Sequence, residues 1–587
     1  MGRTESIAAG VWARVTRVKE VNAEDTSTSL IRCLGLRRLT FVGVGKTVGV
    51  GIYVLIGEAT KEAGPSVIVA FLIGFLVTLL NGLCFAEYAA KNPKTGAQYT
   101  YMYETVGEGL AFLVGWTSII GTTAALSLAS RGWSGYVDSL FEHSIRNYTL
   151  EHIGNWTGSS PRPDYPDIPA ISIIILIMIL ASVGVNMSTT INLLLTIVSG
   201  SMLIFISIIG FVYADLDNWT KHEGGFFANG LNGVLKASTA CFYAFQGYEV
   251  LGYSAEETIN PKKNVPRSIV ISLVIVTFLY INVAFSFTLM IPYTAIDTSA
   301  PFPAAFSYHH VTWAKYIVEI GPILALTNLC ILELYTVQRL TYSMATDGLL
   351  FKFLGRVSST TKVPIGPVII FGPITIILVL TIDLSNLIGF MVLYTFVQYS
   401  IFAAYLIILR YKVTDDSEAK LCKVPLRSKS DIVNCMLVLL SSVKFLVLTM
   451  YLCLFALSIF IVKRGNNLVQ GHSGDIIPVV ALGSAVFTIL ILLRRKEQPA
   501  ADINAFQVPL MPFLPAASMF FNLLMLVSAV DMGSLIASTS LASIGIVVYL
   551  LTVVCDVIRN PDKRDGDDQT KAKLLSTIDE EDAEDLL

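Results

Sequence analysis

Charged residues are scarce in this chain, because Asp, Glu, Lys and Arg together make up only 14% of its 587 residues. An average soluble domain has about 25%. Hydrophobic residues make up 54% of the chain, and its mean hydropathy is +0.65. This composition cannot cover the surface of a water-soluble protein of this length and excludes that class. In lipid, a spanning segment must satisfy its own backbone polar groups, so the sequence predicts an all-α polytopic membrane protein.

Cysteine is sparse where a disulfide would form. All eight cysteines lie in predicted spans or predicted cytosolic segments, and residues 131–167, a predicted outside loop, contain none. This argues against a disulfide framework and against a disulfide-linked partner chain. A light chain of a heteromeric exchanger would usually have a cysteine in that loop and twelve spans, so this alternative is disfavoured. The sequence does not fix the oligomeric state.

Motifs of enzymes are missing as well. The sequence contains no phosphate-binding loop, no metal-ligand cluster and no plausible pair of nucleophile and base. We therefore expect no enzymatic activity, no cofactor and no bound metal, and we expect membrane lipid rather than nucleic acid as the surroundings. Residues 1–40 also lack the short apolar core of a cleavable signal peptide.

Long apolar runs recur along the chain, and each can cross about 30 Å of hydrocarbon. We count fourteen of them, which places both termini on the same side of the membrane. The predicted spans are 41–58, 66–88, 108–129, 169–187, 191–213, 233–254, 268–291, 317–337, 367–382, 385–409, 433–462, 476–493, 510–530 and 534–557.

Lys and Arg gather in every second loop, for example at residues 91–94 and 410–429, which predicts that these loops and both termini are cytosolic. The opposite loops contain the glycosylation sequons of Asn147, Asn155 and Asn218, which agrees with that topology. We expect a plasma-membrane protein. The acidic end of the chain resembles a dileucine sorting signal and leaves an endosomal or lysosomal membrane as the alternative.

Two of the apolar runs are broken by glycine. The first broken segment is 41–57, with its break at 49–51, and the second is 241–249, with its break around 243–246. Unwound backbone is tolerated in hydrocarbon only where it faces protein, water or a ligand, so paired breaks indicate the binding site of a secondary transporter. Glycine also lets membrane helices pack closely. Two breaks at corresponding places favour a site.

Each break falls in the first span of a block of five, which predicts an inverted repeat because five is odd. Amide groups at the first break suit a carboxylate, and carbonyl groups at the second suit an ammonium, so together they predict a site for an α-amino acid. The predicted domains are a cytosolic N-terminal segment (1–38), two five-helix repeats (39–213 and 232–410), four additional helices (432–558) and an acidic cytosolic tail (559–587).

Several stretches resemble the cationic amino acid transporters, which are fourteen-span members of the amino acid, polyamine and organocation superfamily. These stretches are 43–58, 63–66, 82–88, 105–112, 241–249, 256–261, 345–354 and 508–515. The resemblance runs from about residue 30 to residue 557. It implies a five-plus-five inverted-repeat fold of the APC/LeuT type with helices 1 and 6 unwound at the middle. It also implies sodium-independent transport of arginine, lysine and ornithine by alternating access.

The resemblance also implies roles for residues at the breaks. The residues expected to offer amides to the substrate carboxylate are Val50, Gly51 and Ile52. The residues expected to offer carbonyls to its amino group are Thr47, Tyr243, Ala244 and Gln246, and Tyr243 also stands where related antiporters place a gating aromatic.

Two acidic residues match functional positions of the family. Glu249 lies in an otherwise apolar span, and an intramembrane carboxylate is a functional candidate by default. It matches an acidic position that related transporters use to couple protonation or to hold a cationic substrate. Its structural alternative is a hydrogen bond to a freed backbone amide. Glu108 matches an acidic residue that the family needs, with charge complementation at a helix N-terminus as the alternative. For Glu87 and the pair 256–257 we expect salt bridges rather than substrate contacts.

The chain departs from the family at Lys46 and Glu333, where the family usually has small residues. These spans adjoin at the sodium site of sodium-coupled relatives, so the two side chains could pair. Our hypothesis is that the Lys46 ammonium replaces a coupling cation. Some proton-coupled relatives use a lysine in the fifth span, where this chain has Ser199. The alternative for Lys46 is snorkelling to an interface.

The substrate remains open at this level. Gly121 stands where some relatives carry a specificity-setting acid, which predicts a roomier, uncharged wall, and Lys46 also argues against a cationic substrate. Cationic amino acids are the first choice by resemblance. A neutral amino acid, proton-coupled symport and a receptor with little flux are the alternatives.

Overall fold

The structure is a computed structural model of the chain. It describes residues 14, 15, 17, 34–91, 97–105, 107–154, 163, 165–183, 189–221, 225–255, 258–298, 300–358, 364–382, 384–411, 442–469, 473–496, 506–530 and 532–559. The predicted salt bridges of residues 256–257 and the sequon of Asn155 lie outside the described residues.

Helices make up nearly all the regular structure of the described residues, which otherwise contain two isolated β-bridges. The helices of the first half are α2 (Leu36–Thr47), α3 (Val50–Tyr53), α4 (Leu55–Ala63), α5 (Val67–Lys91), α6 (Ala97–Thr105), α7 (Glu108–Leu140), α8 (Ser144–His152), α9 (Ile168–Val183), α10 (Thr189–Val212), α11 (Asp217–Thr220), α12 (Gly230–Ala244) and α13 (Val250–Tyr253). The second half contains α14 (Pro261–Met290), α15 (Pro301–Tyr308), α16 (Thr312–Thr346), α17 (Gly366–Thr381), α18 (Leu384–Arg410), α21 (Val443–Val469), α22 (Ser473–Arg494), α23 (Phe513–Ala529) and α24 (Met532–Arg559).

Eight helical segments of the described residues are long and apolar enough to cross a membrane, and four further apolar helices are shorter. This confirms the predicted class, an all-α polytopic membrane protein. Each of the fourteen predicted spans overlaps a helix of the described residues, and the two broken spans overlap three and two consecutive helix pieces. Length and composition do not by themselves establish fourteen crossings, so that number and the inverted repeat stay predictions.

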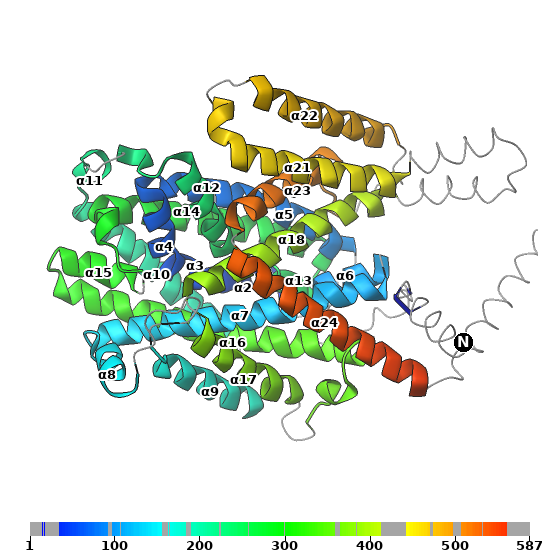
Figure 1. Ribbon diagram of the computed structural model, residues 1–587. Helices are drawn as coiled ribbons and strands as arrows, with labels where there is room; N and C mark the ends of the chain where they lie inside the picture. Colours follow the sequence, from blue (N-terminus) through cyan, green and yellow to red (C-terminus); the bar gives the residue numbers. More distant parts are fainter. Residues whose placement is uncertain are drawn as a thin grey trace, which may run out of the picture.

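The long helices pack in pairs from distant parts of the chain (Figure 1). Helix α7 runs along α16, α5 runs along α14, and α12 packs against α4 and α5. Helix α18 runs along α23, whereas α21 packs mainly on α22 and α23. The interior of the bundle therefore consists of helices from the two predicted repeats, with α21 and α22 at its edge (Figure 1).

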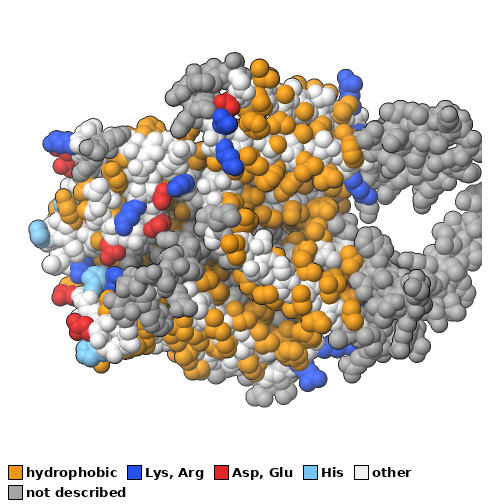
Figure 2. All heavy atoms as spheres, viewed as in Figure 1, with side chains coloured by type: hydrophobic (Ala, Val, Ile, Leu, Met, Phe, Trp, Pro, Cys, Tyr) orange, Lys and Arg blue, Asp and Glu red, His pale blue; other side chains and the backbone are white. Residues whose placement is uncertain are grey.

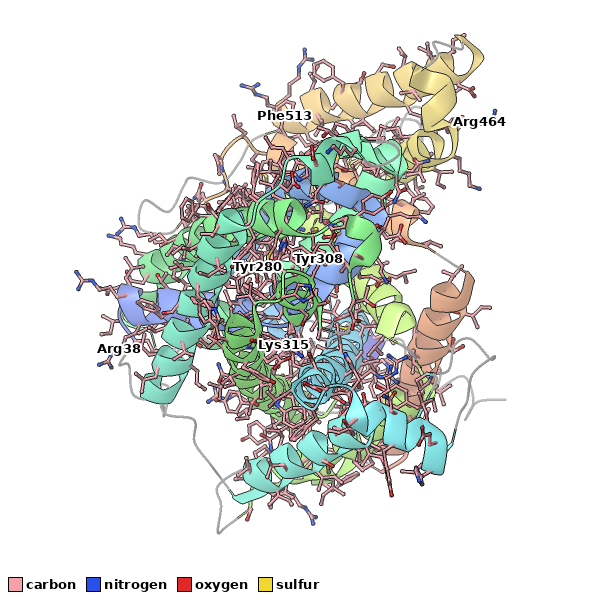
Figure 3. All side chains as sticks on the ribbon, turned by 90° about the vertical axis from the view of Figure 1, so that its left-hand side faces the viewer. Arg38, Tyr280, Tyr308, Lys315, Arg464 and Phe513 are labelled. Atoms are coloured by element: carbon pink, nitrogen blue, oxygen red, sulfur yellow. The ribbon has the colours of Figure 1, made fainter. Side chains whose placement is uncertain are left out.

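The two ends of the bundle carry different elements. Helices α8, α11 and α15 lie at one end, and α6 lies at the other (Figure 1). On the face shown in Figure 2, hydrophobic side chains form a broad band, and charged side chains gather toward the end with α8, α11 and α15. Seen from that end, Tyr280 lies in the middle of the bundle and Arg38 points outward (Figure 3). This distribution fits a belt that faces lipid.

Buried polar contacts join the last helices to the bundle. Asn81 of α5 and Asn522 of α23 exchange side-chain amide hydrogen bonds of 2.9 and 2.8 Å. Glu87 is fully buried and accepts two hydrogen bonds from the Arg410 guanidinium, at 2.8 and 2.7 Å, and one from the Val508 amide at 2.8 Å. Glu87 therefore forms the predicted salt bridge, and the bridge is buried rather than solvated.

Candidate functional site

The first break separates α2 from α3. Helix α2 ends at Thr47, and Val48 and Gly49 are non-helical although the Val48 amide still donates to the Val44 carbonyl at 2.8 Å. Helix α3 has only four residues, and α4 begins at Leu55. Backbone amides at the start of a helix have no partner within that helix. The interruption thus lies at the predicted glycines.

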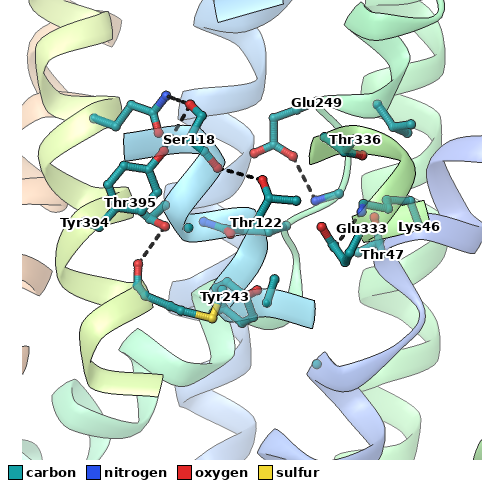
Figure 4. Close-up of a pocket in the computed structure, with 18 of the residues that line it drawn as sticks. Lys46, Thr47, Ser118, Thr122, Tyr243, Glu249, Glu333, Thr336, Tyr394 and Thr395 are labelled. Carbon is teal, nitrogen blue, oxygen red and sulfur yellow. Dashed lines mark hydrogen bonds and ion pairs between the residues drawn. The ribbon is translucent and has the colours of Figure 1, made fainter. Parts of the chain in front are cut away.

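The second break follows α12, which ends at Ala244. Residues 245–249 form turns before the short α13. Gly247 has a φ of +127°, a region that side-chain-bearing residues rarely adopt. Its amide donates to Glu249 Oε2 at 3.0 Å, so the Glu249 carboxylate caps the reversed chain. Figure 4 shows this contact at the edge of a cavity.

The two breaks face each other, as the sequence predicts. A Cβ atom on Gly51 would lie 2.4 Å from Ala244 Cα, and a Cβ atom on Gly247 would lie 2.9 Å from the Lys46 carbonyl carbon and from the Thr47 nitrogen. Neither position has room for a side chain. Each break therefore contributes a glycine that lets the other broken helix approach its backbone.

Tyr280 of α14 joins the two breaks. Its side chain is fully buried, and its hydroxyl lies 2.8 Å from the Thr47 carbonyl oxygen and 3.2 Å from the Ala244 carbonyl oxygen. Both carbonyls were predicted to accept the substrate amino group. A carbonyl oxygen has two lone pairs, so each can still accept a second donor. No signal in the sequence predicts this role of Tyr280.

A cavity of about 130 Å³ lies beside the breaks (Figure 4). The lining residues are Lys46, Thr47, Gly51, Gln98, Ser118, Gly121, Thr122, Ala125, Tyr243, Ala244, Gln246, Gly247, Glu249, Val250, Leu329, Glu333, Thr336, Met391, Tyr394, Thr395, Gln398 and Tyr399. They come from α2, α3, α6, α7, α12, α13, α16 and α18 and from the second break.

Most of the predicted site residues line this cavity. Those that do are Lys46, Thr47, Gly51, Gly121, Tyr243, Ala244, Gln246, Glu249 and Glu333. Those that do not are Ile52, Ser199 and Glu108, whereas the Val50 side chain lies outside the described part of the structure. The Ile52 side chain is fully buried, and the Ser199 carbonyl accepts a hydrogen bond from the Tyr53 hydroxyl at 2.9 Å.

Lys46 and Glu333 form an ion pair across the cavity wall. Lys46 Nζ lies 2.5 Å from Glu333 Oε1, and the two side chains are only 10% and 11% exposed. A buried ammonium in a membrane protein requires a partner, and Glu333 supplies it. The Lys46 side chain therefore does not snorkel to an interface.

Glu249 and Gln246 contribute polar groups from the second break. The Glu249 carboxylate accepts a hydrogen bond from the Gly247 amide, which is the structural role that the sequence suggests as the alternative. The same carboxylate also lines the cavity, so it can contact a bound solute as well. Gln246 Nε2 is buried and, within the described part of the chain, has no hydrogen-bond partner. An unpaired buried amide nitrogen is costly, so this donor is a candidate contact for an occupant.

The wall near Gly121 is not roomy, which corrects one prediction. A Cβ atom on Gly121 would lie 2.3 Å from Cε1 of Tyr394, so the Tyr394 ring of α18 fills the space that the glycine leaves. The Tyr394 hydroxyl lies 3.1 Å from Ser118 Oγ, and Gln398 Nε2 also donates to Ser118 Oγ at 3.0 Å. The wall is uncharged, as predicted, but it is polar and occupied.

Sequence reasoning missed the side chains that α6 and α18 place in the cavity, Gln98, Tyr394 and Gln398. The available signal was local, because Tyr394 and Gln398 are one turn apart in an apolar span and therefore share a face. An apolar helix interrupted by one polar stripe is typical of a helix that lines a polar cavity.

Glu108 lies outside the cavity, in a cluster with the N-terminal segment. Its carboxylate accepts hydrogen bonds from Arg14 at 3.0 Å and from the Tyr103 hydroxyl at 3.1 Å, with the Tyr549 hydroxyl at 3.4 Å and Arg17 at 3.9 Å. Burial and the Glu108 carboxylate raise the pKa of the Tyr103 hydroxyl to about 12. Tyr103 therefore remains a protonated donor at neutral pH.

The predicted glycosylation sites differ in accessibility. Asn147 is exposed on α8. Asn218 is only partly exposed, and its side-chain nitrogen, the atom that would carry a glycan, donates to the Leu289 carbonyl at 2.7 Å. This hydrogen bond favours Asn147 over Asn218. In the part of the chain that the structure describes, no group of three or more His, Cys, Asp or Glu residues could hold a metal ion.

Interrupted helices that meet at a polar, partly charged cavity inside an apolar helical bundle define a membrane permease. The sequence pattern of the amino acid permease family matches residues 34–493, and that of the C-terminus of amino acid permeases matches residues 506–554. The chain therefore belongs to the amino acid permease family.

Individual relatives agree with this assignment. The chain is 34% identical to human "Cationic amino acid transporter 4" over 547 residues, which cover 88% of this chain and 86% of that protein. It is 32% identical to Arabidopsis thaliana "Cationic amino acid transporter 3, mitochondrial" over 66% of this chain and 64% of that protein. It is 33% identical to the "Methylthioribose transporter" of Bacillus subtilis (strain 168) over 59% of this chain and 74% of that protein. The resemblance to the cationic amino acid transporters is confirmed.

Proposed function

We propose that this permease transports cationic amino acids, such as arginine, lysine and ornithine, by alternating access and without sodium. The observation that carries the proposal is the charge of the cavity. Lys46 contributes +1, and Glu249 and Glu333 contribute -2, so the formal charge of the lining is -1. An unbalanced charge away from water is costly. A substrate of net charge +1 balances it, whereas a neutral zwitterion does not.

The backbone of the substrate would bind where the breaks meet. In this proposal the amides of Val50, Gly51 and Ile52 receive the carboxylate. The carbonyls proposed to receive the amino group are those of Thr47, Tyr243, Ala244 and Gln246. The resemblance to the family supports these roles, and Gly51, Ala244 and Gln246 are among the residues that line the cavity.

The absence of sodium coupling would follow from Lys46. Its ammonium is a fixed cation with Glu333 as its counter-ion, at 2.5 Å. Removing that cation would leave the Glu333 carboxylate to be balanced by a proton or a free ion. We propose that Lys46 takes the place of a coupling cation, so that no sodium has to enter with the substrate.

Uptake into proteoliposomes tests the proposal. Labelled arginine and leucine would be offered to the purified protein at two external pH values, with and without sodium and with and without unlabelled amino acid inside. Arginine uptake that is unaffected by sodium supports the proposal, and Glu249→Gln should reduce arginine uptake more than leucine uptake. Arginine uptake that requires sodium, or leucine uptake without arginine uptake, would contradict it. Binding without flux would identify a receptor.

A neutral substrate is the second candidate, and the cavity wall favours it. The side chains of Gln98, Ser118, Tyr394 and Gln398 form a hydrogen-bonded wall without charge. The same uptake assay should therefore include alanine and methylthioribose, because one relative carries the latter name. Proton-coupled symport of a neutral amino acid would appear as uptake that rises at lower external pH.

For the location, we propose the plasma membrane with both termini cytosolic. The distribution of Lys and Arg among the loops supports this orientation. The acidic tail keeps an endosomal or lysosomal membrane as the alternative. Surface labelling of intact cells that express a tagged chain distinguishes the two locations.

A further inference from the structure

One side chain of the short helix α6 reaches the cavity. Gln98 is 5% exposed and lines the cavity together with Gln398 of α18, which is 8% exposed. Gln398 Nε2 donates to Gln98 Oε1 and also to Ser118 Oγ of α7, at 3.0 Å for the latter. The two glutamines thus bridge α6 and α18 at the edge of the cavity, in a hydrogen-bonded group that also includes α7.

The other hydrogen bonds of α6 point to different neighbours. The Tyr99 hydroxyl donates to Asp347 at the end of α16 at 2.5 Å, and the Tyr103 hydroxyl donates to Glu108 at the start of α7 at 3.1 Å. Helices α7 and α16 pack along each other. These two bonds therefore hold α6 to one packed pair of helices, while the Gln98 bond holds it to α18 on another side of the cavity.

The position of α6 matters because it lies at the end of the bundle opposite α8, α11 and α15 (Figure 1). At the far end, the Tyr53 ring packs edge-on against Phe302 of α15, with ring centroids 6.1 Å apart, and both are fully buried. A solute that crosses the bundle from one end to the other has to pass between the cavity and the α6 end (Figure 1). The Gln98–Gln398 bond lies on that route.

We propose that α6 is a lid that stays with α7 and α16 while the cavity opens between α6 and α18, so that the Gln98–Gln398 hydrogen bond must break on each opening. This makes Gln98 a gating residue. The inference goes beyond the proposed function, and it holds for whichever solute the permease carries. It predicts that a covalent link across the Gln98 bond stops transport, whereas a link between α6 and α16 does not.

Two double-cysteine variants of the full chain test this prediction. Gln98→Cys with Gln398→Cys links α6 to α18, and Tyr99→Cys with Asp347→Cys is the matched control that links α6 to α16. Uptake is measured before oxidation with copper phenanthroline, after it, and after dithiothreitol, so each sample is its own reference for the effect of the substitutions. The parent chain controls for its native cysteines.

The expected result is at least a tenfold loss of uptake on oxidation of the α6–α18 pair, restored by dithiothreitol, with uptake retained by the oxidised α6–α16 pair. Retained uptake in the first pair, with the cross-link verified by mass spectrometry, overturns the proposal. Loss of uptake in both pairs also overturns it, because α6 would then have to leave α16 as well.

A second measurement needs neither transport nor a cross-link. Thr122 lines the cavity from α7, so Thr122→Cys places a thiol there. This thiol is labelled with a membrane-impermeant maleimide that is added from one side of the vesicle or from the other. Gln98→Leu removes one hydrogen bond, which shifts a closed–open equilibrium by about two- to tenfold. Labelling from the α6 side should accelerate by that factor and labelling from the other side should not.

The control for this measurement is Gln338→Leu, the same substitution in a buried position of α16 outside the cavity lining. It should leave both labelling rates unchanged. Unchanged rates in Gln98→Leu, or equal acceleration from both sides, would show that the bond does not hold a lid. Because no substrate is present, this outcome is independent of whether the proposed amino acid transport fails.

Discussion

Replacing Tyr280 with Phe should weaken substrate binding far more than the loss of one oxygen atom suggests. The Tyr280 hydroxyl lies within hydrogen-bond distance of the Thr47 and Ala244 carbonyls, one from each break. Its ring packs against Phe71 and Phe245, with centroids 5.8 and 5.2 Å away, and phenylalanine keeps those contacts. The substitution therefore removes only the bond that ties the two breaks to α14.

The size of the effect follows from burial. Tyr280 is fully buried, and a buried polar group left without its partner costs about 1–3 kcal/mol. Each 1.4 kcal/mol is about a tenfold change in an equilibrium constant. If that cost falls on the arrangement that binds substrate, affinity should fall by about 5- to 150-fold. Thermal stability should fall as well.

Tyr248→Phe is the matched control. Tyr248 is also fully buried, at the second break, but its hydroxyl has no hydrogen-bond partner in the described part of the chain. Removing an unsatisfied buried hydroxyl should be neutral or stabilising. Both variants would be compared by binding of labelled substrate and by thermal unfolding in detergent. Equal behaviour of the two variants would refute the role assigned to Tyr280.

Three further predictions address the charges and the breaks. Glu333→Gln removes the carboxylate that contacts the buried Lys46 ammonium, so thermal unfolding should show a loss of about 3–5 kcal/mol, which the added substitution Lys46→Met should largely restore. Unchanged stability in the single variant would show that the ion pair does not stabilise the fold. Glu87→Gln should lower the free energy of unfolding by a similar amount, because the buried Arg410 guanidinium loses its carboxylate partner. The ratio of arginine to leucine uptake should stay constant, because this pair lies outside the cavity lining. Gly247→Ala should abolish uptake, because the φ of Gly247 is +127° and the added Cβ atom would lie 2.9 Å from backbone atoms. The control is Gly474→Ala in α22, which has open space around it and should leave uptake intact. Uptake by the Gly247→Ala variant would contradict the close packing of the two breaks.

The sequence was sufficient for features whose signal is local. Glycine in an apolar run predicted both breaks, and the rule that an intramembrane carboxylate is a functional candidate predicted Glu249. Lys46 and Glu333 were predicted because they depart from the family pattern. The resemblance to the family then supplied roles. All three charged residues line the cavity in the structure, and the pairing of Lys46 with Glu333 follows from the same rule that a buried charge in lipid needs a partner.

Features that depend on packing between distant helices could not be predicted in this way. A tyrosine in an apolar span, such as Tyr280 or Tyr394, is as compatible with lipid contact as with a buried hydrogen bond, and only the neighbouring helices decide. The prediction of a roomier wall at Gly121 was wrong for the same reason, because the Tyr394 ring that fills the space comes from a helix more than 270 residues away in the chain.

The mutual packing of the breaks has a consequence for alternating access. Gly51 lies against Ala244, Gly247 lies against the backbone of Lys46 and Thr47, and Tyr280 bridges the same two segments. Sliding one broken helix along the other would drive backbone atoms into contact at both glycines. We therefore expect the two breaks to move as one unit. The cavity then has to open where helices meet through side chains alone, and the hydrogen bond between Gln98 and Gln398 is such a place.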